Sequence, residues 1–110
     1  MDYCGLAAKA GKIVCGADAV NEQILKNKVY LVIIAEDSSN KTKEKFIRIS
    51  NEHKIKYFVV GKIDENSRYI GKKNKAIIGI VDNNFSEAIS KVIIGGDAIE
   101  QKDSWISKRT

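Results

Sequence analysis

The chain has 110 residues, of which 44% are hydrophobic and 30% are charged, and its formal net charge is +5. This length fits one domain, and the composition is typical of a globular protein rather than a disordered or membrane-spanning one. The basic balance favours a polyanionic partner, and the start of the chain lacks the pattern of a signal peptide, so we expect a cytoplasmic protein.

The first third of the chain predicts two helices and two strands. Residues 3–10 carry apolar side chains at helical spacing, Leu6 among them, and a glycine follows them. A short strand at 13–15 leads through a second glycine into a helix from residue 17 to about residue 27. The next strand, 31–35, is apolar throughout rather than alternating, which predicts that both of its faces are covered.

Caps and apolar spacing also define the rest of the chain. The elements expected there are a third helix after a cap at 38–40, a strand at 56–60, a short helix at 64–69, a strand at 76–81, and a last helix between a cap at 82–84 and the glycines at 95–96. Strands that alternate with helices predict an α/β fold, here a three-layer α/β/α sandwich with a small mixed sheet of about four strands. Residues 1–96 are therefore expected to form a single domain, and 97–110 a flexible C-terminal tail.

The chain offers no recognisable catalytic or metal-binding pattern. Cys4 and Cys15 form no C-x-x-C pair and suit reduced core residues, and His53 stands without a partner motif. Dinucleotide and phosphate-loop patterns are missing from the sequence as well. We therefore expect a binding protein that is not an enzyme and uses no cofactor or metal.

Gly16 and the acids after the second strand are the most informative features. A glycine at a helix start leaves backbone N–H groups free and allows another backbone to approach, which suits a phosphate chain. The apolar strand at 31–35 then delivers Glu36 and Asp37 at its end. These features and the net charge make RNA the expected ligand.

With this order of elements, the chain resembles the L7Ae/L30e family of ribosomal proteins, and especially its bacterial branch. The matching blocks are Gly5-Leu6-Ala7 to Ala10-Gly11-Lys12, Gly16, Leu31 to Asp37, Tyr69-Ile70-Gly71-Lys72, and Ile80-Val81-Asp82. Members of that family are small α-β-α sandwich proteins that bind kink-turn RNA. The resemblance thus implies a structured RNA partner, either ribosomal RNA or another kink-turn RNA, and an association with the ribosome. We also expect a monomeric protein, and the short apolar runs predict no membrane partner.

The resemblance also implies a site made of three segments: the glycine with the helix that follows it, the acid pair, and the loop before the last strand. The candidate RNA-binding residues are Lys12, Gly16, Ala17, Asp18, Asn21, Glu22, Lys26, Glu36, Asp37, Lys72, Lys73, Asn74 and Lys75. We expect phosphate contacts from the lysines and a close backbone fit at the glycine.

The chain departs from the family pattern Gly-x-Asn-Glu-x-x-Lys at the helix start. Asp18, Ala19 and Glu22 occupy the amide, carboxylate and lysine positions. Asn21, one helical turn further in, can supply an amide on the same helix face. Because acids near a helix start repel phosphate, a second reading stays open, in which the domain is a protein-interaction module that has lost kink-turn recognition.

For two other groups of candidate RNA-binding residues, a purely structural role is an alternative to RNA contact. Asp37 can cap the third helix instead of serving a binding loop. The lysines of 72–75 can form an ordinary solvated loop instead of contacting phosphate.

Overall fold

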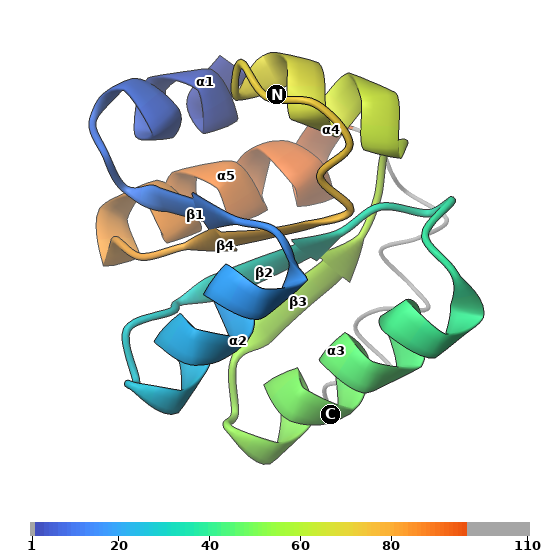
Figure 1. Cartoon of the computed structure of the whole chain (residues 1–110). Coiled ribbons are helices and arrows are strands. Elements are labelled where there is room, and N and C mark those ends of the chain that lie inside the picture. The colour runs from blue at the N-terminus through green and yellow to red at the C-terminus, as the bar shows by residue number, and fades with distance from the viewer. Residues whose placement is uncertain (1, 97–110) are drawn as a thin grey trace.

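Helices and strands alternate along the chain as the sequence predicts (Figure 1). The computed structural model describes residues 2–96, so the expected tail at 97–110, with Trp105, lies outside the described residues. The elements are α1 (Asp2–Lys9), β1 (Ile13–Cys15), α2 (Ala17–Leu25), β2 (Leu31–Ile34), α3 (Asn40–Glu52), β3 (Lys56–Val59), α4 (Ile63–Tyr69), β4 (Ile77–Ile80) and α5 (Asn83–Gly96).

The four strands form one mixed sheet in the order β1-β4-β2-β3. β4 runs antiparallel to both β1 and β2, whereas β2 and β3 are parallel. The register places Ile34 opposite Ile77 of β4 on one side and Val59 of β3 on the other. β2 is therefore an interior strand, and the prediction that both of its faces are covered is confirmed, because every residue from 31 to 35 is 0% exposed.

Helices cover both faces of the sheet, which gives the expected three layers (Figure 1). On one face, α1 and α5 pack over Leu31, Ile33 and Ile80. On the other face, α2 and α3 pack over Val32 and Ile34. The alternation of side chains along a strand divides β2 between the two halves of the core.

The ends of the helices differ slightly from the prediction. α1 stops at Lys9, and Leu6 is 52% exposed although its neighbour Ala7 is fully buried. Successive helix positions are about 100° apart, so a helix this short turns one apolar side chain inward and the next outward. The glycines expected to stop the last helix, Gly95 and Gly96, both lie within α5, which runs to Gly96.

The topology gathers four connections at one end of the sheet. β1, β2 and β3 end there and β4 begins there, as the registers show. We call this the loop end; it comprises Gly16 and residues 35–39, 60–62 and 70–76. Gly16, the acid pair and the loop before β4, one part of each expected segment, lie at the loop end, although they are far apart in the sequence.

Candidate nucleic-acid interface

Gly16 forms the turn between β1 and α2. Its φ of +92° is a conformation that L side chains rarely adopt, and its N–H donates to the carbonyl of Ile77 at 2.9 Å. The first bond within α2 runs from the N–H of Val20 to the carbonyl of Gly16. The N–H groups of residues 17–19 consequently have no partner inside the helix, and all three residues are exposed. The glycine thus presents free backbone donors at the loop end.

Lys75 brings a cation to this turn. Its Nζ lies 4.0 Å from the position that a Cβ at residue 16 would occupy. The backbone of Lys75 is fixed from behind, because its N–H donates to Oγ of Ser67 at 2.7 Å. Two of the expected segments, the glycine turn and the loop before β4, therefore meet at a free helix start beside an ammonium group.

The acid pair contacts the connection between β3 and α4. Asp37 Oδ1 accepts a hydrogen bond of 2.8 Å from the N–H of Ile63, the first residue of α4. Asp37 thus caps α4, and the alternative that it caps α3 is wrong. The cap of α3 is Ser39, whose side chain accepts from the N–H of Thr42. Because Ser39 already occupies the N-cap position of α3, the side chain of Asp37 bonds the start of α4 instead.

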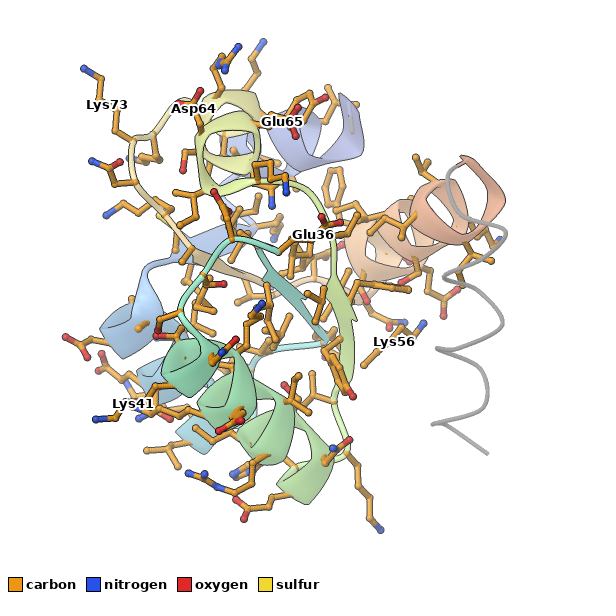
Figure 2. The ribbon with its side chains drawn as sticks, turned by 90° about the vertical axis from the view of Figure 1, so that its right-hand side faces the viewer. Glu36, Lys41, Lys56, Asp64, Glu65 and Lys73 are labelled. Atoms are coloured by element: carbon orange, nitrogen blue, oxygen red, sulfur yellow. The ribbon has the colours of Figure 1, made fainter. Side chains whose placement is uncertain are left out.

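Glu36 is also turned toward α4 (Figure 2). Its N–H donates to the carbonyl of Gly61 at 2.8 Å, and its Oε1 lies 3.5 Å from Nζ of Lys62. Its own carbonyl accepts from Nζ of Lys43 on α3 at 2.9 Å. Figure 2 shows Glu36 beside α4, whose exposed acids Asp64 and Glu65 are labelled. The acid pair therefore holds the loops after β2 and β3 together.

Three residues that hold the loops were missed at the sequence level. Gly61 has a φ of +75°, and a Cβ there would lie 2.2 Å from Oδ1 of Asn66. Asn66 is buried and donates to the carbonyl of Val60 at 2.9 Å, while its neighbour Ser67 binds Lys75. Two adjacent polar residues inside a short helix, where an apolar stripe would be expected, were the available signal of buried polar partners.

The rest of the last loop is exposed. Lys72, Lys73 and Asn74 lie at its tip, and Figure 2 shows Lys73 extending away from the ribbon. Among the side chains of residues 5–94, the ion pairs at this end of the molecule use Lys62 and Arg68, and the lysines of 72–75 have no carboxylate partner. The loop is consequently the part of the loop end with uncompensated positive charge.

The exposed face of α2 has the opposite charge. Asp18 and Glu22 are exposed, and Asn21 is half-buried between them. Lys26 caps the far end of the helix and pairs with Glu22 at 3.4 Å. The nine residues of α2 lie between Gly16 and Lys26, so ten steps of 1.5 Å along the helix place the two residues about 15 Å apart.

Lys12 is the other candidate that the structure does not bring to the loop end. It precedes the three-residue strand β1, whereas Gly16 follows that strand, and the four residue steps between them span about 13 Å. Its carbonyl accepts from the N–H of Val81 at the opposite end of the sheet. The remaining candidates from Gly16 to Glu22, the acid pair and the loop at 72–75 do lie together.

No group of three or more histidine, cysteine or acidic side chains within residues 5–94 has the geometry to hold a metal ion. The helices in this part of the chain are also too short or too polar to cross a membrane.

Comparisons with known proteins agree with this geometry. Residues 1–90 match the sequence profile of the ribosomal protein L7Ae/L30e/S12e/Gadd45 family. The chain is 34% identical over 95 residues to the RNA-binding protein YlxQ of Enterococcus faecium, a match that covers 86% of this chain and 91% of the relative. It is 30% identical over 89 residues to the RNA-binding protein YlxQ of Bacillus subtilis, with 81% and 89% covered.

Two solved structures share the fold. A protein with unknown function from Bacillus halodurans C superposes with a TM-score of 0.81 at 32% identity, covering 84% of this chain and 93% of that one. A 15.5kD RNA binding protein of Giardia lamblia superposes with a TM-score of 0.73 at 17% identity, covering 83% and 78%. At that low identity, the second likeness concerns the fold alone.

Proposed function

The chain belongs to the ribosomal protein L7Ae/L30e/S12e/Gadd45 family, and on this basis we propose that it is a non-enzymatic protein that binds structured RNA at the loop end. The names of its two YlxQ relatives support RNA as the ligand. The observation that carries the proposal is the meeting of Gly16 and Lys75, which places free helix N–H groups beside an ammonium group. Helix starts with free N–H groups attract phosphate, and a nearby lysine adds charge.

The finer proposal is that the RNA contains a kink-turn and that the protein acts on ribosomal RNA, as a monomer in the cytoplasm. Three separate loops that meet at one end of a rigid sheet can follow a sharply bent backbone better than a straight one. The acids Asp37 and Glu36 join the loop after β2 to the start of α4, and Ser67 of α4 holds the loop before β4, which supports an interface that is ordered without RNA. Such preorganisation lowers the cost of ordering on binding.

The test compares a kink-turn duplex with a duplex of equal length in which the kink is replaced by Watson–Crick pairs. Binding is followed by fluorescence anisotropy at about 50 and 200 mM salt. If Lys72, Lys73 and Lys75 each neutralise one phosphate, the slope of log K against log salt is about −2.7, and affinity falls about 40-fold over that fourfold change. The kinked RNA should bind more tightly at both concentrations. Equal binding of the two duplexes would contradict kink recognition.

A second candidate function rests on the face of α2. Asp18 and Glu22 are exposed there, and Leu25 on the same helix is 64% exposed. An apolar side chain beside acids suits a protein partner better than a phosphate chain. If neither duplex binds above background, a protein-interaction module that has lost kink-turn recognition becomes the preferred function.

A further inference from the structure

A hollow of about 530 Å³ adjoins the loop end and shares residues 70–72 with it; it lies between α1, β1 and the residues that follow α4. Figure 1 shows these three elements around one corner of the molecule, with α1 above β1 and the end of α4 beside it. Gly5 makes the close approach possible, since a Cβ there would lie 3.1 Å from the carbonyl oxygen of Tyr69. A space of this size is typical of small-ligand sites.

Three cations from different segments line this hollow. Lys9 comes from the last turn of α1, Arg68 from the last turn of α4, and Lys72 from the loop after it. Arg68 is also bound by Asp64 at 2.6 Å, which fixes its guanidinium. Among the side chains that the structure describes, those of residues 5–94, Lys9 and Lys72 have no carboxylate partner, and no acid lines the hollow. Because Asp64 already compensates the charge of Arg68, the excess positive charge of the hollow comes from Lys9 and Lys72. A ligand with a phosphate group fits this charge, and the guanidinium nitrogens of Arg68 that Asp64 does not use can add a hydrogen bond to it.

The remaining walls can hold a flat ring. Tyr69 lines the hollow and is 46% exposed, and Ile13 gives a partly buried apolar surface. An aromatic side chain of this kind is the usual stacking partner of a nucleobase. The hollow therefore combines a site for phosphate with a site for a base.

β1 adds hydrogen-bonding groups at the same place. It is an edge strand, and its residues Lys12 and Gly16 bond β4 through their backbones. Because hydrogen-bonding direction alternates along an antiparallel strand, the backbone groups of Ile13 and Cys15 point to the open edge. Both of these residues line the hollow, so a donor and acceptor pair is available for the edge of a base.

We propose that this hollow is a second binding site, beside the loop end and sharing Lys72 with it, that takes one nucleoside monophosphate unit. The phosphate contacts Lys9 and Arg68, and the base lies on Tyr69. The unit can be a free mononucleotide or the 5′-phosphorylated end of an RNA strand, since both present the same groups. The site does not depend on the proposed function, because a mononucleotide has no kink.

The test uses the full chain and nitrogen-15 NMR titrations with adenosine monophosphate, adenosine and inorganic phosphate, in the absence of other RNA. Adenosine monophosphate should shift the amides of residues 13–15 and 69–72, and it should bind at least tenfold more tightly than either fragment. Lys9→Ala and Tyr69→Ala should each weaken binding by about tenfold, the loss expected for one charged or stacking contact.

Matched controls separate a local loss from a general one. Tyr30→Ala removes a ring that is 48% exposed at the other end of the sheet, and Lys41→Ala removes an exposed lysine of α3 (Figure 2). Both should bind adenosine monophosphate like wild type. The double variant Lys73→Glu with Lys75→Glu, which impairs RNA binding at the loop end, should also bind adenosine monophosphate like wild type. This variant therefore distinguishes failure of the proposed function from failure of the mononucleotide site.

Oligonucleotides then identify the source of the unit. If a hexanucleotide with a 5′-phosphate binds tenfold more tightly than the same strand with a 5′-hydroxyl, and Tyr69→Ala removes the difference, the site takes an RNA end. If only the mononucleotide binds, the site takes a free nucleotide. The proposal is overturned if phosphate alone binds as well as adenosine monophosphate, if the controls lose as much affinity as Tyr69→Ala, or if no shift appears at residues 13–15 and 69–72.

Discussion

Gly61→Ala is the substitution whose cost the structure specifies best. The residue has a φ of +75°, which costs an alanine about 1–2 kcal/mol. The new Cβ would also lie 2.2 Å from Oδ1 of Asn66, so that side chain must move. Asn66 is 3% exposed and donates to the carbonyl of Val60, and losing this buried bond costs about 1–3 kcal/mol. The free energy of unfolding should therefore fall by about 2–5 kcal/mol.

Urea denaturation followed by circular dichroism measures this loss, and two further variants test its cause. Gly71→Ala is the matched control, since Gly71 has a φ of +71° and open space around its missing Cβ; it should lose only about 1–2 kcal/mol. In an Asn66→Ala background the clash is gone, so Gly61→Ala should again cost only about 1–2 kcal/mol. The reasoning is refuted if Gly61→Ala costs no more than Gly71→Ala, or if its cost is unchanged when Asn66 is absent.

Three further outcomes are expected. Charge reversal at Lys73 and Lys75 should weaken RNA binding and flatten the salt slope by about one unit for each lost phosphate contact; an unchanged slope in anisotropy titrations would remove the loop from the interface. Asp18→Asn with Glu22→Lys restores the family pattern at two positions and should tighten kink-turn binding more than tenfold, because one charged contact is worth about 1.5–3 kcal/mol. Unchanged affinity would favour the protein-interaction reading. Ile33→Ala should cost about 2–5 kcal/mol in urea denaturation because the side chain is fully buried, and a loss under about 1 kcal/mol would contradict that burial.

Local patterns in the sequence were enough to predict the elements and their layers. The unbroken apolar run at 31–35 predicted an interior strand, and helical spacing together with caps such as Ser39 and Asp82 placed the helices. These signals are local because hydrogen bonding and burial repeat along the element itself. The exposed Leu6 shows the limit of this kind of prediction, since apolar spacing does not determine which residue of a short helix packs against the core.

The sequence predicted only part of the loop-end site, because the rest depends on how the strands are arranged in the sheet. Gly16 and Lys75 meet because β1 and β4 are antiparallel neighbours, and strand order is not a local property of the sequence. Lys26 and Lys12 looked equally suitable as basic residues, yet the lengths of α2 and β1 carry them away from the loop end. Asp37 could not be assigned to α4 before Ser39 was seen to occupy the cap of α3.

Buried polar groups add to the apolar packing that holds the loop end, and they determine how the loop end responds to substitutions. Asn66 and Ser67 are buried in α4, and through them one short helix fixes the loop after β3 and the loop before β4. Hydrogen bonds in a buried network have fixed directions, whereas apolar contacts tolerate sliding, so such a network positions the loops more sharply. The same network makes the loops sensitive to residues that never reach the surface. Substitutions at Asn66 or Ser67 should consequently alter ligand binding at Lys75 without removing any side chain that faces the ligand.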